Sequence, residues 1–185
     1  MNRPLIKLAV GLYASVFVLL ALVSGHYSKS AHKPPSGSGV ALAQTSAEPL
    51  DFTVIDLAGK AVRLKDWRGR PVIVDFWATW CPPCRKEIPE LNEIYRRYQG
   101  DGLVVLGVSM DEVQGEGRKV VKPFIDEFKI EYPIAMGDEA LIDKLDLNSV
   151  PTALFIKRDG RLLSRVEGAG TKGELTQTVL ALLKK

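Results

Sequence analysis

The pattern of apolar residues predicts an α/β fold with a mixed central sheet. From Pro49 onward, short segments typical of strands alternate with segments of helical periodicity. Two strand segments near the end flank Asp159-Gly160, a dipeptide that strongly favours a tight hairpin turn. Because the alternation ends in this hairpin and a final helix, we expect parallel and antiparallel strands in one sheet covered by helices.

The expected elements follow one another without an internal repeat. Ala58-Gly59-Lys60 predicts the turn of an N-terminal hairpin, and two nearly continuous apolar runs indicate strands that are covered on both faces. Thr171 and Glu174 have the spacing of a capping box, and Asp138 could cap a shorter helix. In chain order we predict strands over 52–57, 61–64 and 72–77, a helix with apolar positions from 88 to 98 that Pro89 should kink, a strand over 103–108, a helix around 120–128, a strand near 134, a helix carrying 141 and 145, strands over 153–157 and 162–167, and a helix over 175–183.

Length and composition describe a single globular domain with appendages. The chain has 185 residues, of which 46% are hydrophobic and 25% are charged. The formal net charge of +3 is too small to indicate a nucleic-acid partner.

The N-terminal part differs from the rest. Arg3 and Lys7 precede an uncharged apolar run that ends at Val23. As a helix this run would be roughly 24 Å long, a little less than the hydrocarbon core of a bilayer. Residues 1–23 are therefore predicted to be a membrane anchor or an export signal. Residues 24–47, rich in Ser, Gly, Ala and Pro, are predicted to be a flexible linker, and residues 48–185 the folded domain.

The fate of the apolar segment decides where the domain resides. Ala41-Leu42-Ala43 has the small-x-small form of a signal-peptidase site, but cleavage normally falls much closer to the apolar run. We expect a retained anchor with the domain on the extracytoplasmic side. If the segment is cleaved, the domain is released into the periplasm.

The chain has only two cysteines, which lie together in Trp80-Cys81-Pro82-Pro83-Cys84 between a predicted strand and a predicted helix. Residues three apart on a helix share a face, so Cys84 can reach Cys81 when Cys81 occupies the helix start. Free backbone N–H groups and the helix dipole favour the thiolate of Cys81 there, whereas Cys84 should keep its proton longer. The sequence therefore predicts a thiol–disulfide exchange enzyme. Cys81 attacks a substrate disulfide, and Cys84 resolves the mixed disulfide.

Other uses of the two cysteines fit less well. A zinc site needs two further ligands, and both histidines, His26 and His32, lie in the predicted linker. A haem attachment site needs a histidine after the second cysteine, where Arg85 stands. A purely structural disulfide stays an alternative, although so short a loop stabilises little. No metal and no cofactor is expected.

The motif Val74-Asp75-Phe76-Trp77-Ala78-Thr79-Trp80-Cys81-Pro82-Pro83-Cys84, with Val150-Pro151-Thr152 further on, resembles the thioredoxin superfamily. The apolar N-terminus, the Asp66-Trp67-Arg68-Gly69-Arg70-Pro71 segment, the insertion near 115–136 and Arg85-Lys86-Glu87-Ile88-Pro89 resemble the membrane-tethered TlpA/ResA/CcmG-like oxidoreductases. The resemblance covers roughly residues 48–185. It implies a thioredoxin-like three-layer sandwich with helices on both faces of the sheet, an N-terminal β-hairpin and a central inserted helix and strand.

The resemblance also implies roles for residues around the cysteines. Pro151 corresponds to the family's cis-proline, which would let backbone groups of Val150 pair with an extended substrate. An ordinary trans proline is the alternative. Trp80 and Pro82 would form the apolar rim of the substrate groove, whereas Trp77 is expected in the core.

Two carboxylates are candidates for proton transfer. Asp75 interrupts an apolar strand, where an isolated charge is costly, and it matches the buried aspartate of thioredoxins. Glu87 matches an acidic residue of ResA-like proteins, with a solvated helix position as the alternative. We expect raised pKa values for both carboxyls and joint tuning of the thiols, with Asp75 closer to Cys84. Which of the two accepts the proton stays open.

The resemblance implies reduction of disulfides in extracytoplasmic proteins, notably apocytochrome c or copper-centre proteins. Electrons would come from a membrane thiol carrier of the DsbD/CcdA type. A disulfide-forming oxidase, a thiol peroxidase and a copper-handling protein with two thiolate ligands are the alternatives.

Overall fold

A computed structural model describes residues 48–114 and 117–184. The predicted anchor or signal, the whole predicted linker and both histidines lie outside these residues, so the expectations for them stay predictions. Within the two described ranges, no helix has the length and apolar character needed to cross a membrane.

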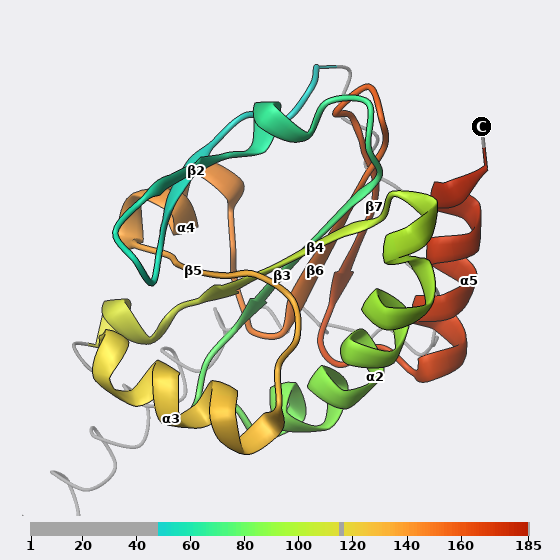
Figure 1. Ribbon diagram of the computed structural model, residues 1–185. Coiled ribbons are helices and arrows are strands. Elements are labelled where there is room, and N and C mark those ends of the chain that lie inside the picture. The colour runs from blue at the N-terminus through green and yellow to red at the C-terminus, as the bar shows by residue number, and fades with distance from the viewer. Residues whose placement is uncertain (1–47, 115–116, 185) are drawn as a thin grey trace, which may run out of the picture. The chain divides into compact units, whose positions relative to one another are not determined.

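Strands of both orientations form one sheet (Figure 1). The strands are β1 (Thr53–Asp56), β2 (Ala61–Arg63), β3 (Val72–Trp77), β4 (Val104–Ser109), β5 (Ile134–Met136), β6 (Thr152–Ile156) and β7 (Leu162–Glu167). Their order across the sheet is β2-β1-β5-β4-β3-β6-β7. The pairs β3–β4 and β4–β5 are parallel, and the other pairs are antiparallel. The prediction of a mixed sheet with an N-terminal hairpin is confirmed.

Helices cover both faces of this sheet. They are α2 (Pro82–Tyr98), α3 (Arg118–Phe128), α4 (Glu139–Leu145) and α5 (Lys172–Leu183), with short 3-10 turns η2 (Leu64–Trp67), η3 (Gln99–Asp101) and η4 (Asp111–Gln114). Buried residues of α2, α3 and α5 pack on one face, and buried residues of α4 and η2 pack on the other. In Figure 1, α2 and α5 lie next to each other, well apart from α4. The expected three layers are therefore present.

Local signals in the sequence explain where several elements begin. The side chain of Asp138 accepts a hydrogen bond from the backbone N–H of Leu141 at the start of α4. Thr171 and Glu174 form the predicted capping box of α5. Gly160 has φ of +83° in the β6–β7 hairpin, a conformation that glycine adopts without strain. Helix α2 continues through Pro89, and the kink expected there stays a prediction.

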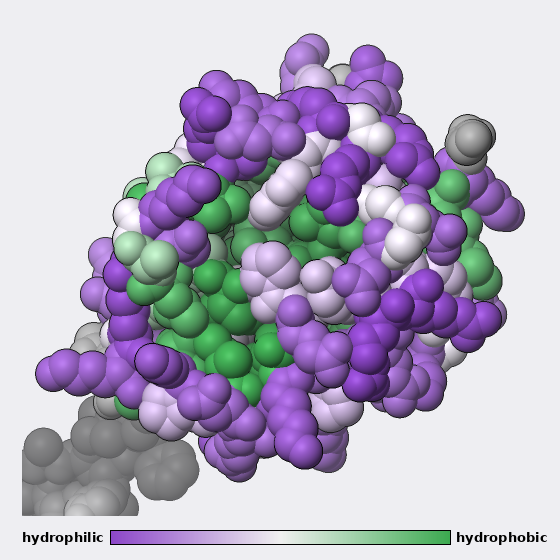
Figure 2. All heavy atoms as spheres, in the orientation of Figure 1, coloured by the Kyte–Doolittle hydropathy of each residue, from purple (hydrophilic) through white to green (hydrophobic). Residues whose placement is uncertain are grey.

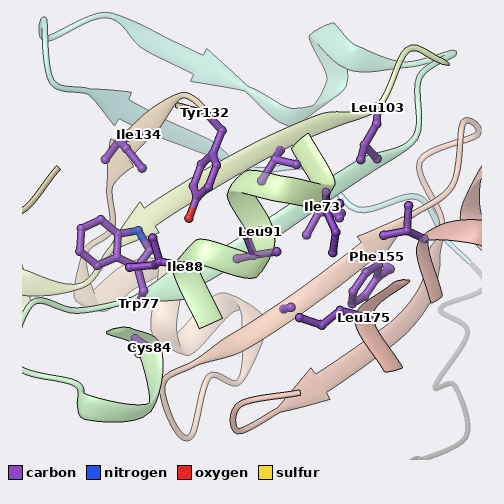
Figure 3. Close-up of a cluster of buried hydrophobic side chains, with 14 of the residues drawn as sticks. Ile73, Trp77, Cys84, Ile88, Leu91, Leu103, Tyr132, Ile134, Phe155 and Leu175 are labelled. Atoms are coloured by element: carbon purple, nitrogen blue, oxygen red, sulfur yellow. The ribbon is translucent and has the colours of Figure 1, made fainter. Parts of the chain in front are cut away.

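Two hydrophobic cores lie on opposite faces of the sheet. The α2-side core is shown in Figure 3 and contains Ile73, Trp77, Ile88, Leu91, Phe124, Phe155 and Leu175. The α4-side core contains Leu64, Val74, Phe76, Leu106, Leu141 and Leu154. Successive side chains of a strand point to opposite faces, so β3 contributes alternately to the two cores. Because Ile73 and Trp77 face the α2-side core, Asp75 faces it as well.

The surface is unevenly polar. Figure 2 shows one face on which hydrophobic residues gather in a hollow, with hydrophilic residues around it. Among the described residues, the large hydrophobic side chains that are clearly exposed are Ile55, Trp80 and Leu180. Of these, Trp80 directly precedes the first cysteine.

Candidate active site

The two cysteines form a disulfide at the start of α2, with an S–S distance of 2.01 Å. Cys81 is the N-cap residue, and its Sγ accepts a hydrogen bond from the backbone N–H of Cys84 at 3.2 Å. The predicted position of Cys81 is therefore confirmed. Pro82 and Pro83 open the helix, where the missing N–H of proline leaves no hydrogen bond unmade. In this oxidised form both cysteines are buried.

An apolar hollow lies next to Trp80, the residue before Cys81. It has a volume of about 150 Å³ and is lined by Trp80, Met110, Val113, Ile142, Leu147, Asn148, Ser149 and Val150. Trp80 is 50% exposed, and Pro82 is also exposed. Trp77 is completely buried, as expected. The Val150–Pro151 peptide bond is cis, as the resemblance implies, and the alternative of an ordinary trans proline is excluded.

Both candidate carboxylates are buried in the layer of α2. Asp75 is 2% exposed and Glu87 is 3% exposed, so a solvated position for Glu87 is excluded. Burial raises the pKa of Asp75 well above its usual range, and the neighbouring charge of Glu87 raises it further. Burial also raises the pKa of Glu87 to about 7, although a hydrogen bond from the backbone of Gly170 opposes this shift. Glu87 can therefore hold a proton near neutral pH, and burial favours the protonated form of Asp75 as well.

The turn before the cysteines is held by a buried carboxylate that the sequence analysis did not single out. Asp111 is completely buried and accepts hydrogen bonds from the backbone N–H and the Oγ1 of Thr79, the latter at 2.5 Å. The Oγ of Ser109 donates to the same carboxylate at 2.6 Å. Ser109 ends the buried strand β4, and Asp111 lies two residues further on. These two polar residues at the end of an apolar run were the signal in the sequence that could have identified the site.

Arg85 holds the same turn from the other side. Its Nε and Nη2 donate to the carbonyl oxygen of Thr79 at 3.1 and 2.9 Å. The guanidinium also lies over the ring of Phe124, 5.2 Å from the centroid, and near Phe128. Arg85 thus connects the active-site turn to α3. Among the described residues, no group of three or more His, Cys, Asp or Glu side chains is arranged to hold a metal ion.

Thiol–disulfide exchange is the chemistry that a disulfide at this helix start supports, and the protein is accordingly a thiol–disulfide oxidoreductase of thioredoxin-like fold. Residues 46–165 match the AhpC/TSA family, and the chain belongs to that family.

Named relatives agree with this assignment. The chain is 32% identical over 178 residues to the thiol-disulfide oxidoreductase ResA of Bacillus cereus. The matched residues cover 95% of this chain and 94% of the relative. It is 32% identical over 164 residues to ResA of Geobacillus thermodenitrificans, with coverage of 88% and 90%.

Solved structures give the same result. A Chlorobium tepidum protein described as the thiol:disulfide interchange protein DsbE is similar with a TM-score of 0.68 and 29% identity, over 76% of this chain and 98% of that one. StoA from Bacillus subtilis is similar with a TM-score of 0.60 and 26% identity, over 72% and 99%. The predicted fold class, the resemblance and the enzyme class are confirmed.

Proposed function

We propose that the protein reduces disulfide bonds in partner proteins, with Cys81 as the attacking residue and Cys84 as the resolving residue. The observation that carries the proposal is the hydrogen bond from the Cys84 N–H to Cys81 Sγ at the start of α2. A backbone donor and the helix dipole stabilise a thiolate at this atom, and the thiolate is the reactive form of cysteine.

The reaction balances as two exchange steps. In the reduced enzyme, the Cys81 thiolate attacks one sulfur of the substrate disulfide and releases the other as a thiolate, which takes up a proton. The Cys84 thiol then loses its proton and attacks Cys81 Sγ, which releases the second substrate sulfur. The substrate gains two electrons, and the enzyme ends with the Cys81–Cys84 disulfide. A membrane thiol carrier of the DsbD/CcdA type would return the enzyme to the dithiol form.

The buried carboxylates serve the second step in this proposal. Cys84 and Glu87 are three residues apart on α2 and therefore share a face of the helix. A carboxyl with a pKa of about 7 is suited to accept and return a proton at neutral pH. Asp75, buried in the same layer, would share that proton with Glu87.

The apolar hollow would receive the substrate segment next to its cysteine. Trp80 and Val150 line the hollow; Pro151 directly follows Val150 in the chain, and Pro82 lies two residues after Trp80. Partners with an exposed apolar segment near a disulfide fit such a surface. Apocytochrome c or a copper-site protein is our proposed substrate, with the enzyme anchored through residues 1–23 and its domain extracytoplasmic.

Trapping tests the assignment of the two cysteines. In a Cys84→Ser variant the first step can occur but the second cannot, so mixed disulfides should accumulate on Cys81. The matched control is Cys81→Ser, which should trap no partner and should reduce model disulfides no faster than background. Equal trapping by both variants would contradict the assigned roles. Since an oxidase would use the same atoms in reverse, the measured redox potential decides the direction: a potential well below that of periplasmic disulfide-forming enzymes supports a reductase.

A further inference from the structure

The residues that flank Asp75 in the sheet are small, which lets larger side chains approach its carboxyl. Asp75 lies opposite Gly107 in the parallel pair β3–β4 and opposite Ala153 in the antiparallel pair β3–β6. Two of the smallest residues therefore flank the buried carboxylate. A Cβ at Gly107 would lie 2.9 Å from Trp77 Nε1 and 3.0 Å from Tyr132 Cε2. The rings of Trp77 and Tyr132 thus occupy the space beside Asp75 that a side chain at position 107 would fill.

Four polar atoms of Asp75 and the side chains around it are buried and have no hydrogen-bond partner among the described residues. They are Asp75 Oδ1, Glu87 Oε2, Trp77 Nε1 and Tyr132 Oη. Two are carboxylate acceptors, and two belong to groups that can donate. Buried polar groups are nearly always satisfied in proteins, and an exception calls for an explanation. Because donors and acceptors lie in the same layer, hydrogen bonds between them can form when one of the two carboxyls ionises.

Tyr132 is the member of this group best placed to serve both carboxylates. The residue is 3% exposed and lies just before β5. Figure 3 shows its hydroxyl directed toward Trp77 and the part of α2 that carries Ile88, the residue after Glu87. Trp77 has less freedom to turn, because its ring stacks on Phe124 with the centroids 5.0 Å apart.

We propose that the hydroxyl of Tyr132 donates a hydrogen bond to the anion of the Asp75–Glu87 pair and so keeps one of these carboxyls ionised as the base for Cys84. Tyr132 is a positioning residue in this scheme, because it keeps its own proton throughout. This inference rests on the proposed function, in which the pair takes the proton of Cys84.

The charges around the hydroxyl are consistent with this role. Burial, together with the charges of Asp75 and Glu87, raises the pKa of Tyr132 well above its usual value, so the hydroxyl stays protonated. From α2, the carboxylate of Glu90 raises the pKa of Glu87, and its Oε2 is also buried without a partner among the described residues.

Two more groups contribute to this environment, one from the segment before α5 and one from α2. From the segment before α5, the backbone of Gly170 donates to Glu87. The ring of Tyr95 packs edge-on against Tyr132 at 6.2 Å. The thiols of Cys81 and Cys84, once reduced, complete the set of titratable groups.

The test is Tyr132→Phe, which removes the hydroxyl and keeps the ring. Loss of a donor to an anion raises the pKa of the carboxyl pair, so the base forms at higher pH. We expect the pH midpoint of substrate release from the mixed disulfide to rise by about one unit, equivalent to a tenfold lower fraction of base below the midpoint. The matched control is Tyr95→Phe, which removes a hydroxyl from the adjoining ring on the partly exposed side and should leave the midpoint unchanged.

The outcomes separate this inference from the proposed function. If Glu87→Gln and Asp75→Asn move the midpoint and Tyr132→Phe does not, Tyr132 has no such role. Equal shifts in Tyr132→Phe and Tyr95→Phe would also overturn it. If neither Glu87→Gln nor Asp75→Asn moves the midpoint, the proposed proton transfer through the Asp75–Glu87 pair is wrong, and the role of Tyr132 is overturned with it.

A measurement on the unaltered chain covers the case in which Tyr132→Phe does not fold. The ¹³Cζ resonance of Tyr132 in the reduced protein should titrate with the midpoint of the carboxyl pair, because the hydrogen bond forms only to the anion. A resonance that stays constant through that midpoint would overturn the inference.

Discussion

The two cores of this domain differ in what they bury. The α2-side core contains the disulfide, two carboxyls and several polar atoms without partners among the described residues. The α4-side core consists of apolar side chains together with Thr152, whose buried hydroxyl donates to the carbonyl oxygen of Ser149. Each unsatisfied buried polar group costs about 1–3 kcal/mol. The layer that performs the chemistry is therefore built at the expense of stability, and the opposite layer can be packed for stability alone. The alternation of β3 keeps the two apart, because Asp75 points to one side and its neighbours Val74 and Phe76 point to the other.

The largest expected change in stability comes from truncating the α4-side core. Leu106 is 1% exposed and pairs in register with Val74. Leu106→Ala should lower the free energy of unfolding by about 2–5 kcal/mol, because it removes buried contacts and leaves a cavity. Urea unfolding measures this loss. The pH dependence of disulfide exchange per folded molecule should not change.

A substitution on the neighbouring strand β3 should have the opposite effect, a change in the pH profile without a loss of stability. Asp75→Asn removes a buried carboxyl from the α2-side core, so it should change the pH profile of exchange while stability stays equal or increases. If Leu106→Ala moved the pH profile as much as Asp75→Asn does, the two layers would not be functionally separate.

Stability should depend on pH through the α2-side core. The pKa of Glu87 is about 7 in the folded protein, against 4.5 for an ordinary glutamate. Between these values the folded state binds more protons than the unfolded state, so the free energy of unfolding falls as pH rises from 4.5 to about 7. The loss amounts to at most about 3 kcal/mol for this group. Glu87→Gln should remove most of this decrease, as measured by urea unfolding of the oxidised protein across that range.

The matched control for Glu87 lies two turns further along α2. Glu93 is exposed, and its hydrogen bond with Lys172 lowers its pKa. Glu93→Gln should therefore keep the decrease in stability between pH 4.5 and 7. Asp75, whose pKa is also raised, accounts for the slope that remains in Glu87→Gln. If the free energy of unfolding of Glu87→Gln still fell by the full amount between pH 4.5 and 7, the raised pKa of Glu87 would be contradicted.

A smaller difference in stability is expected between alanine substitutions at two glycines, one from each layer. A Cβ at Gly107 would meet Ile134 Cδ1 at 2.5 Å and the rings of Trp77 and Tyr132. A Cβ at Gly137, on the α4 side, would meet the side chain of Met110, which is long and can move. We expect Gly107→Ala to cost about 1–3 kcal/mol and Gly137→Ala less than about 1 kcal/mol. Thermal unfolding of both variants measures the difference, and equal costs would show that the α2-side layer is no more tightly packed.

Much of the fold could be predicted because its signals are local. The turn at Asp159-Gly160, the capping box at Thr171 and the apolar runs of β3 and β4 each lie within a few neighbouring residues. The position of Cys81 at a helix start is local in the same sense. Asp75 and Glu87 could be proposed because a charge in an apolar strand and an acidic residue one turn after Cys84 are visible in the sequence.

The partners of these residues could not be predicted, because the order of strands brings them together. Tyr132 precedes β5, which lies next to β4 in the sheet although α3 separates the two in the chain. No periodicity in the sequence places Tyr132 near Asp75. Asp111 reaches Thr79 for the same reason, since the backbone N–H of Met110, at the end of β4, bonds to Trp77 at the end of β3.

The bond between Asp111 and Thr79 has a consequence for how the enzyme's preferences can change. Asp111 begins the connection to α3, and its carbonyl oxygen also accepts the N–H of Gly117. A change in the length or sequence of this connection would be transmitted through one carboxylate to the loop bearing Trp80. Remodelling a peripheral insertion could thus retune partner choice, while the sheet and the cysteine pair are inherited intact.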